Sequence, residues 1–314
     1  AIDAIKGKKN LNIFVLHPHN RISPVQRKLM TTGKDENVFN IAVKGNFDDC
    51  QNLVKSMFSD KEFSNQINMS GVNSINWARI IAQSVYYFYC YFLAEDDNQP
   101  INFSVPTGNF GDVYAGYLAK KLGLPINKLI VATNQNDILH RAISKGKYEA
   151  EHVSETISPS MDIQIASNFE RLIYDLNNHD SSQTLDDMKN IKQNGKYTID
   201  DEKLKKINQD FLSARMSEQE TLDVIKNIYE KFNMVLDPHT AIGYGAFDKH
   251  DLKGNNIVLA TAHPCKFPDA ILKAINLKSD LPNELKFILD EKENYGIIEN
   301  NLKEIKQYIL GKIK

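Results

Sequence analysis

The turn at residues 108–111 carries the residue types that most directly suggest chemistry. Gly108, Asn109, Phe110 and Gly111 follow an apolar run and precede a helical pattern. Backbone N–H groups at a helix N-terminus lack intrahelical partners, and the helix dipole adds partial positive charge there. Glycines let an anion approach those groups closely. The turn therefore predicts a phosphate-binding loop, although two glycines at this spacing also suit an ordinary tight turn.

Asp112 directly follows this turn, and its carboxylate would repel a phosphate. We expect its side chain to cap the turn or helix, with only its N–H group facing the anion.

A second group of anion-binding residue types consists of Asn73, Ser74 and Arg79. Asn73 or Ser74 could cap a long apolar helix predicted at 75–93, and Arg79 lies about one turn into that helix. A guanidinium there can make two parallel hydrogen bonds to an anion. The structural alternative is a helix cap with a buried ion pair.

Thr261 ends a predicted strand, and α/β sheets gather ligand-binding residues at strand ends. A packed threonine with no ligand is the alternative. His263 precedes a proline, so a structural role in a rigid turn is favoured over proton transfer. His17, His19 and His239 lack metal-ligand spacing, so no metal site is expected.

These motifs together resemble those of threonine synthases of the fungal and enterobacterial kind. Thr-Gly-Asn-Phe-Gly-Asp at 107–112 resembles the cofactor-phosphate loop of that family. Further matching segments occur in the same order along the chain, at residues 21–24, 30–32, 71–79, 158–162, 167–171, 236–241 and 261–264. The resemblance covers nearly the whole chain and is far more specific than any single motif.

The resemblance implies a fold-type II pyridoxal-phosphate enzyme, similar to the tryptophan synthase β subunit. Its mainly parallel sheets would be flanked by helices. The implied reaction converts O-phospho-L-homoserine and water to L-threonine and phosphate, by γ-elimination and β-addition of water.

The family's binding residues carry over by position. The cofactor phosphate would be held by Gly108, Asn109, Phe110, Gly111 and Asp112. Thr261 would place its hydroxyl against the pyridine nitrogen. The substrate phosphate would bind at Asn73, Ser74 and Arg79. Asp162, Asn168 and Arg171 match family segments but acquire no role.

The resemblance also implies a Schiff-base lysine that this sequence lacks. In the family that lysine precedes the residues matched here, and residues 1–5 resemble a helix that follows its segment. Lys266 lies near Thr261, but the family pattern supports Thr261 rather than a cofactor lysine at this place. No catalytic residue is therefore assigned in the chain, and we expect the chain alone not to make threonine.

Two other functions stay open at this point. Another fold-type II lyase, such as a serine/threonine dehydratase or a cysteine synthase, would share the cofactor loop. Its substrates carry no γ-phosphate, so a second anion cluster argues against it. A noncatalytic phospho-ligand-binding relative would require a gene that encodes no lysine segment upstream.

Strand and helix patterns alternate along the chain and predict an α/β fold with a mainly parallel sheet. The predicted strands are 11–16, 37–43, 101–105, 128–132 and 256–260. The predicted helices are 24–30, 47–58, 75–93, 113–122 and 269–275. A sheet of about six strands would bring the loop and Thr261 together.

The expected domains are a smaller α/β lobe at 1–71, a large cofactor-binding domain at 72–275 and a C-terminal helical segment at 276–314. A helical insertion is expected at about 168–232. The helix at 75–93 is apolar on nearly all sides, so we expect it in the interior. Its apolar run is too short to span a membrane.

Composition limits the remaining classes of function. The chain has 314 residues, enough for about two domains. A net charge of -2 gives no basic excess for nucleic acid or anionic lipid. Three scattered cysteines do not form a disulfide framework, which favours the cytoplasm. We expect a small-molecule enzyme that is a monomer or homodimer.

Overall fold

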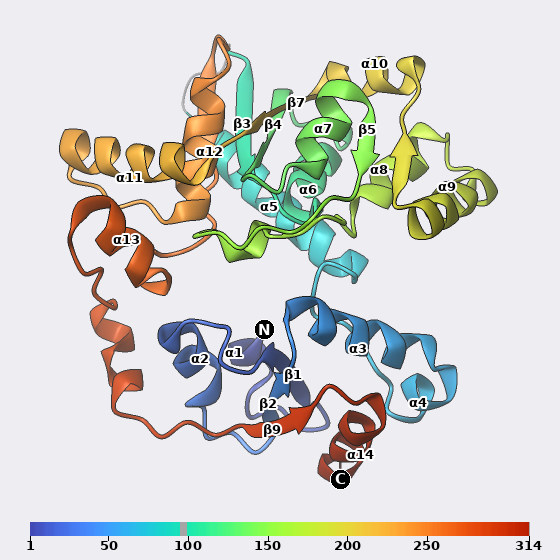
Figure 1. The fold of residues 1–314 in the computed structure, drawn as a ribbon, viewed down its shortest axis with the longest axis vertical. Coiled ribbons are helices and arrows are strands. Elements are labelled where there is room, and N and C mark those ends of the chain that lie inside the picture. Colours follow the sequence, from blue (N-terminus) through green and yellow to red (C-terminus); the bar gives the residue numbers. More distant parts are fainter. Residues whose placement is uncertain (95–98, 314) are drawn as a thin grey trace. The chain divides into compact units, whose positions relative to one another are not determined.

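The chain divides into two compact units in the computed structural model, which describes residues 1–94 and 99–313 (Figure 1). Unit 1 contains Ala1–Val72 and Asp280–Lys314, and unit 2 contains Asn73–Ser279. Residues 276–314 were expected to form a separate helical segment. The structure instead places this stretch, from Asp280 onward, in the same unit as the first 72 residues.

Unit 1 is built on a parallel sheet with the strand order β1-β2-β9. β1 (Ile13–Pro18) and β2 (Val38–Lys44) are the two apolar runs predicted as strands. β9 (Gly296–Glu299) was not predicted, because its four residues fall in a charged stretch with a helical pattern. The C-terminal stretch therefore supplies an edge strand as well as helix.

The helices of unit 1 begin at recognisable sequence signals. Ser23 accepts a hydrogen bond from the Gln26 N–H at 3.2 Å, and Pro24 takes the first helical position. Asn46 and Asp49 form a reciprocal capping box. The helices are α1 (Ile2–Ile5), α2 (Pro24–Thr31), α3 (Phe47–Ser59), α4 (Lys61–Gln66), the 3-10 helix η3 (Asn283–Leu289) and α14 (Leu302–Lys312).

Unit 2 contains a four-stranded parallel sheet with the order β7-β4-β3-β8. The strands are β3 (Ile101–Pro106), β4 (Ile126–Thr133), β7 (Phe211–Arg215) and β8 (Asn255–Val258). Every residue of β3 is buried, as a central parallel strand requires. The sheet has four strands over the described residues, where about six were expected. Because the strands are parallel, their carboxyl ends share one edge.

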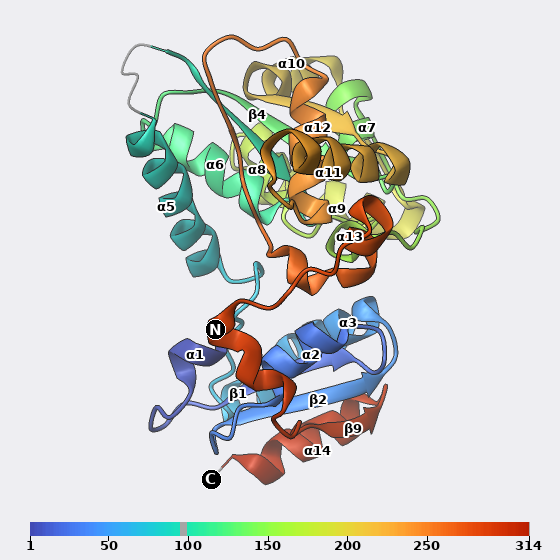
Figure 2. The same ribbon diagram turned by 90° about the vertical axis from the view of Figure 1, so that its left-hand side faces the viewer.

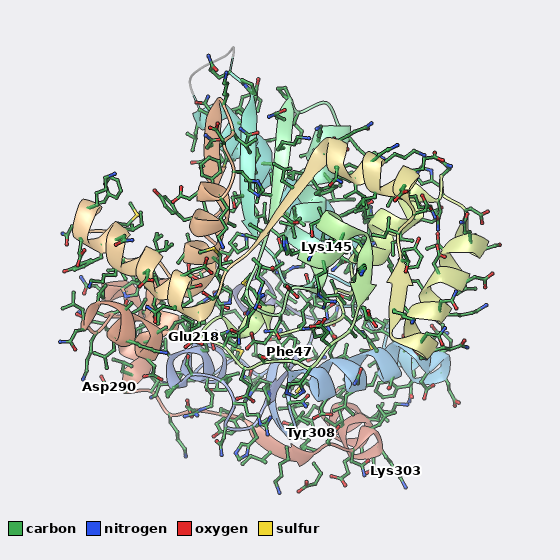
Figure 3. All side chains as sticks on the ribbon, turned by 45° about the horizontal axis from the view of Figure 1, so that its top comes forward. Phe47, Lys145, Glu218, Asp290, Lys303 and Tyr308 are labelled. Atoms are coloured by element: carbon green, nitrogen blue, oxygen red, sulfur yellow. The ribbon has the colours of Figure 1, made fainter. Side chains whose placement is uncertain are left out.

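Helices pack around this sheet. They are α5 (Trp77–Leu93), α6 (Gly111–Lys121), α7 (Ile138–Lys145), α8 (Phe169–Leu176), α9 (Ser181–Asn194), α10 (Asp201–Asp210), α11 (Glu218–Phe232), α12 (Pro238–Asp248), α13 (Pro268–Ile275) and the 3-10 helices η1 (Pro159–Met161) and η2 (Pro264–Lys266). Lys273 of α13 pairs with Glu218 of α11 at 2.6 Å, and Figure 3 labels Glu218 at the start of its helix.

The region expected as a helical insertion, about 168–232, is only partly that. It contains α8, α9, α10 and α11, as its charged amphipathic pattern predicts. It also contains β6 (Lys196–Thr198), which pairs with β5 (Lys147–Glu149), and β7, which joins the main sheet beside β4. β7 is not predicted from the sequence, because it is short and lies between charged helices.

Helix α5 is not an interior helix, and that prediction is wrong. Ile80 and Tyr87 are fully buried, whereas Val85 is 60% exposed and Phe92 is 75% exposed. Figure 2 shows α5 lying on the outer side of α6. One face of α5 packs against α6, and its other face is apolar and accessible. Among the described residues, no helix is long and apolar enough to cross a membrane.

Candidate anion site at the starts of α5 and α6

The loop after β3 turns the chain sharply into α6. Phe110 is the residue that makes the turn, with a left-handed backbone φ of 69°. This conformation is uncommon for a residue with a side chain. The buried Phe110 ring packs edge-on against the Phe169 ring, with 5.2 Å between the ring centroids. It packs at a tilt against the Phe211 ring, with 5.7 Å between the centroids. Burial of the ring therefore holds the backbone of the loop in place.

The start of α6 offers unsatisfied hydrogen-bond donors. Gly111 donates its N–H to the Asn109 Oδ1 at 3.0 Å. Within the described parts of the chain, the N–H groups of Phe110, Asp112 and Val113 have no acceptor. These groups lie at the positive end of a helix, which is the geometry that binds a phosphate. The loop therefore fits the phosphate group predicted from its sequence.

The two loop glycines permit close packing of the backbone. A Cβ atom on Gly108 would lie 2.5 Å from the Ser160 carbonyl oxygen. A Cβ atom on Gly111 would lie 3.1 Å from the Ser74 Cβ and 3.3 Å from the Asn168 Nδ2. Neighbouring protein atoms thus leave no room for a side chain at Gly108 and little room at Gly111, so the two glycines do not by themselves demonstrate a ligand.

Asp112 does not cap the helix, and that expectation is wrong. Its carboxylate Oδ1 accepts from the buried Tyr87 hydroxyl at 3.3 Å, and its carbonyl oxygen accepts from the same hydroxyl at 2.9 Å. Burial raises the pKa of Asp112 to about 6, and the Tyr87 hydrogen bond and the Arg79 charge only partly oppose that rise. The side chain turns toward α5 because Tyr87 supplies a partner there.

Ser74 joins the two sequence motifs. Its Oγ accepts from the Asn109 Nδ2 at 3.0 Å and from the Asn168 Nδ2 at 2.9 Å. Ser74 is 8% exposed and Asn168 is 2% exposed. We call these three residues the amide–hydroxyl cluster. The two predicted anion clusters are thus in direct contact through one serine.

The residues before α5 differ in detail from the expectation. Neither Asn73 nor Ser74 caps the helix, because α5 begins at Trp77 and its cap is Asn76, which accepts from the Ala78 N–H at 3.0 Å. Asn73 instead accepts from the Ile75 N–H at 3.1 Å. The serine is thereby held outside the helix, beside the loop.

Arg79 projects from the first turn of α5 and is exposed. Its positive charge lowers the pKa of Asp112, although burial outweighs this effect.

Arg171, which had no predicted role, contacts the amide–hydroxyl cluster. Arg171 donates through Nε to the Asn168 Oδ1 at 2.9 Å and through a terminal nitrogen to the Ile75 carbonyl at 3.2 Å. Its guanidinium lies over the Trp77 ring, 5.2 Å from the centroid. Asn168 and Arg171 lie in one matching segment of the sequence, but only the packing of α8 brings them to Ser74.

Thr261 follows β8, the strand that pairs with β3. Ser104 of β3 lies opposite Val258 of β8, and the Leu259 N–H donates to the Ser104 carbonyl at 3.0 Å. Thr261 and the loop therefore follow adjacent parallel strands at one edge of the sheet, as expected from the sequence. Thr261 is exposed.

His263 takes the turn role favoured above, since its Nδ1 accepts from the Cys265 N–H at 3.2 Å. Lys266 lies in the short helix η2 that this contact begins.

Asp162, which had no predicted role, fixes a neighbouring loop. It accepts from the Thr156 hydroxyl at 2.6 Å, from Asn134 at 2.7 Å and from Asn136 at 3.0 Å. Burial raises the pKa of Asp162, and these donors oppose the rise. This network holds the segment that contains Ser160, the residue in close contact with Gly108.

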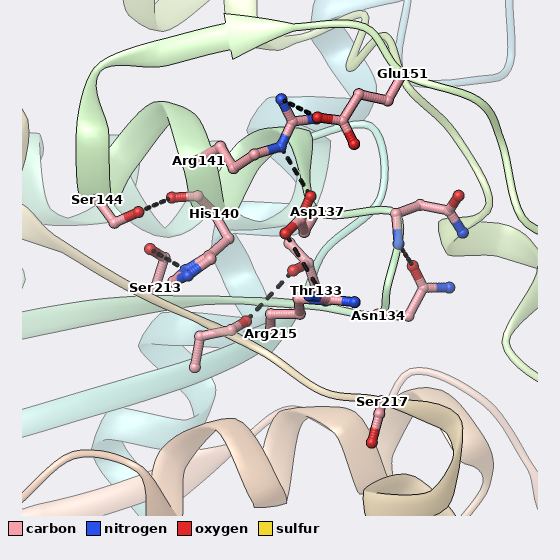
Figure 4. Close-up of polar contacts among 12 residues, drawn as sticks. Thr133, Asn134, Asp137, His140, Arg141, Ser144, Glu151, Ser213, Arg215 and Ser217 are labelled. Carbon is pink, nitrogen blue, oxygen red and sulfur yellow. Dashed lines mark hydrogen bonds and ion pairs between the residues drawn. The ribbon is translucent and has the colours of Figure 1, made fainter.

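A further charged network lies at the carboxyl ends of β4 and β7 (Figure 4). Asp137 accepts from Arg141 at 2.9 Å and lies 3.7 Å from the Arg215 guanidinium, while Arg141 also pairs with Glu151 at 3.1 Å. His140 shares a hydrogen bond with Ser213 at 3.0 Å. The arginines are paired with carboxylates, so this network stabilises the loops and is not a second anion site.

A surface hollow in unit 1 contains an ion pair. A hollow between α4 and α14 is lined by Asp60, Phe63 and Lys306, but it belongs to unit 1 and its Lys306 is paired with Asp60. No group of side chains suited to hold a metal ion occurs in residues 1–94 and 99–313.

The sequence of the chain is similar to those of threonine synthases. A family model described as threonine synthase, C-terminal, matches residues 240–309. The threonine synthase of Pseudomonas aeruginosa is 42% identical over 312 residues, which cover 98% of this chain and 66% of that protein. The threonine synthase of Saccharomyces cerevisiae is 45% identical over 327 residues, which cover 95% of this chain and 64% of that protein.

A solved structure is similar over the full chain. The crystal structure of a PLP-bound threonine synthase from Brucella melitensis has a TM-score of 0.93 and 45% identity, covering 100% of this chain and 68% of that one. The chain thus spans 66% and 64% of the length of the two curated relatives above.

Proposed function

The chain belongs to the threonine synthase family of fold-type II enzymes, and from that membership we propose that the protein converts O-phospho-L-homoserine and water to L-threonine and phosphate with pyridoxal 5′-phosphate. The observation that carries the proposal is the Ser74–Asn109 contact at 3.0 Å. This contact joins the loop at the start of α6, with its free N–H donors, to the predicted anion-binding group at Asn73, Ser74 and Arg79. Two adjacent anion sites suit the proposed reaction, because both the cofactor and the substrate carry a phosphate group.

The loop after β3 is proposed to hold the cofactor phosphate. The N–H groups of Phe110, Asp112 and Val113 would donate to it, and Gly108 and Gly111 let the loop pack closely enough to present them. When bound, the cofactor supplies an electron sink for bond cleavage next to the substrate's α-carbon. Thr261 would meet the pyridine nitrogen with a neutral hydroxyl, which stabilises a protonated ring less than a carboxylate does.

The substrate phosphate is proposed to bind at Asn73, Ser74 and Arg79. This group departs in the elimination step, so donors that neutralise it favour its departure. Arg79 supplies a positively charged guanidinium with several N–H donors. Ser74 supplies a buried hydroxyl, whose hydrogen bond to a charged group is screened less by solvent than one at the surface.

No residue of this chain is proposed as the cofactor-binding lysine. Lys266 lies in η2, and the family pattern at this place supports Thr261 instead. We expect residues 1–314 alone not to form threonine, since the proton transfers at the substrate carbons need that lysine. Threonine formation by this chain well above a cofactor-only control would contradict this expectation.

The cellular setting is proposed from composition. The three cysteines are free, two of them buried, which suits a reducing cytoplasm. The proposed partner is the small-molecule substrate, with the protein acting as a monomer or homodimer.

Steady-state kinetics of the protein as its gene encodes it test the proposal. Ser74→Ala and Arg79→Met should each lower kcat/KM for O-phospho-L-homoserine by about tenfold or more, since each removes a hydrogen bond to a charged group. The cofactor's absorbance should be retained. Absence of threonine from a cofactor-loaded, folded protein would contradict the proposed reaction.

A further inference from the structure

Ser74 has an unusual hydrogen-bond inventory. A hydroxyl has one proton to donate and two lone pairs to accept with. Two amide groups donate to the Ser74 Oγ, from Asn109 at 3.0 Å and from Asn168 at 2.9 Å. Both lone pairs are therefore in use. Among the residues that the structure describes, none accepts the Ser74 proton.

The orientation of both amides is fixed by groups that can only donate. The Asn109 Oδ1 accepts from the Gly111 backbone N–H at 3.0 Å, so its Nδ2 must face Ser74. The Asn168 Oδ1 accepts from the Arg171 Nε at 2.9 Å, so its Nδ2 must also face Ser74. Exchanging oxygen and nitrogen in either amide would bring two donors together.

Arg171 is itself firmly held. Its terminal nitrogen donates to the Ile75 carbonyl at 3.2 Å, and its guanidinium lies 5.2 Å from the Trp77 ring centroid. Both contacts are made to the residues that follow Ser74. The arginine therefore links α8 to the start of α5.

We propose that Arg171 and Asn168 are positioning residues that keep the Ser74 hydroxyl as a hydrogen-bond donor to a phosphate group. Arg171 donates to the Asn168 oxygen, which turns the Asn168 nitrogen toward Ser74. The Asn168 nitrogen donates to the Ser74 oxygen, which leaves the Ser74 proton for a ligand. A phosphate monoester dianion accepts hydrogen bonds only, so it matches a hydroxyl held in this state. Ligands that must donate a proton at this point are disfavoured.

The ligand chemistry has two possible sources, the cofactor's phosphate and the substrate's phosphate. The assignment rests on the proposed function only for the identity of the ligand. The hydrogen-bond order itself follows from the described contacts.

A binding experiment on the full-length protein tests this order of contacts. Inorganic phosphate is titrated into cofactor-saturated protein by phosphorus NMR, and cofactor affinity is measured separately by absorbance. The variants are Ser74→Ala, Asn168→Leu and the double substitution, with Asn208→Leu as a matched control on exposed α10. Each single variant should weaken one of the two affinities by about tenfold or more.

The double variant decides whether Asn168 acts through Ser74. It should bind no more weakly than Ser74→Ala, because the relay ends at the missing hydroxyl. Losses that multiply, or an Asn168→Leu protein with unchanged affinity in both titrations, would overturn the proposal. Loss of free-phosphate affinity alone assigns the donor to the substrate, and loss of cofactor affinity alone assigns it to the cofactor.

Asn168→Asp guards against a folding defect in the leucine variant. Its carboxylate keeps the shape and pairs with Arg171, but it accepts the Ser74 proton in place of the ligand. It should lose affinity at least as strongly as Asn168→Leu, and wild-type affinity would overturn the proposal. These titrations do not require the enzyme to turn over. If the protein forms no threonine but the variants lose affinity as described, the proposed reaction is wrong and the role of Arg171 and Asn168 stands.

Discussion

Asp112 couples the start of α6 to pH. Burial raises its pKa to about 6 from the ordinary 3.8, so between these values the native state holds a proton that the unfolded state has released. Its contribution to the free energy of unfolding is therefore present at low pH and is lost as pH rises through this window. A shift of this size corresponds to at most about 3 kcal/mol.

Asp112→Asn should remove that dependence. Urea unfolding of the variant between about pH 4 and about pH 7 should show a shallower fall in the free energy of unfolding than the parent protein. Asp162 also has a raised pKa and stays in both proteins, so it cancels in the comparison. A steeper fall in the variant would contradict the assigned direction.

Phe110 combines a buried ring with a left-handed backbone. Phe110→Ala should lower the free energy of unfolding by about 3–5 kcal/mol through the lost packing. Phe110→Gly should be more stable than the alanine variant by about 1 kcal/mol, because glycine accepts this φ without strain. Thermal or denaturant unfolding of the pair measures the difference. An alanine variant more stable than the glycine variant would show that the backbone is not left-handed there.

The roles of single residues could be predicted from the sequence only where their partners are close along the chain. Residue types and spacing near helix starts predict anion binding at residues 108–112 and at Ser74, and this binding stays a prediction. Asn168 and Arg171 were not assigned, because their partners are distant in the sequence and only the packing of α8 brings them together. Asp112 was placed wrongly, because its partner Tyr87 lies on another helix.

The contact between α5 and α6 depends on a glycine at the element scale. A Cβ atom on Gly116 would lie 2.4 Å from Tyr87 and 2.9 Å from Leu129. Gly116→Ala should therefore lower the free energy of unfolding by about 1–3 kcal/mol. Gly311→Ala in α14 is the matched control, since nothing lies within 4 Å, and it should gain about 0.5–1 kcal/mol. Equal effects of both substitutions in chemical denaturation would refute the close contact.

Elements with long apolar runs were predictable, and short ones were not. β3 and β4 are buried and were found within a few residues of their true bounds. β7 and β9 are short, lie among charged helices and gain their stability from pairing with distant strands. Helix α5 was predicted, but the exposure of its outer face was not, because an apolar sequence does not show which residues pack against it.

The accessible apolar face of α5 is the main surface feature of unit 2. Val85→Lys and Phe92→Lys should each change the free energy of unfolding by less than about 0.5 kcal/mol, because these side chains are 60% and 75% exposed. Tyr87→Ala, on the buried face, should cost about 3–5 kcal/mol. Light scattering of the Val85→Lys/Phe92→Lys protein should also show less self-association. Large losses from the lysine variants would mean that this face is buried in solution.

At the scale of the whole molecule, the proposed reaction breaks a carbon–oxygen bond and adds water to carbon. The most direct measurement is to run the full-length, cofactor-loaded protein on O-phospho-L-homoserine in heavy-oxygen water and to analyse both products by mass spectrometry. We expect the heavy oxygen in the threonine hydroxyl and none in the released phosphate. Heavy oxygen in the phosphate, with homoserine as the other product, would identify a phosphatase and contradict the proposed function.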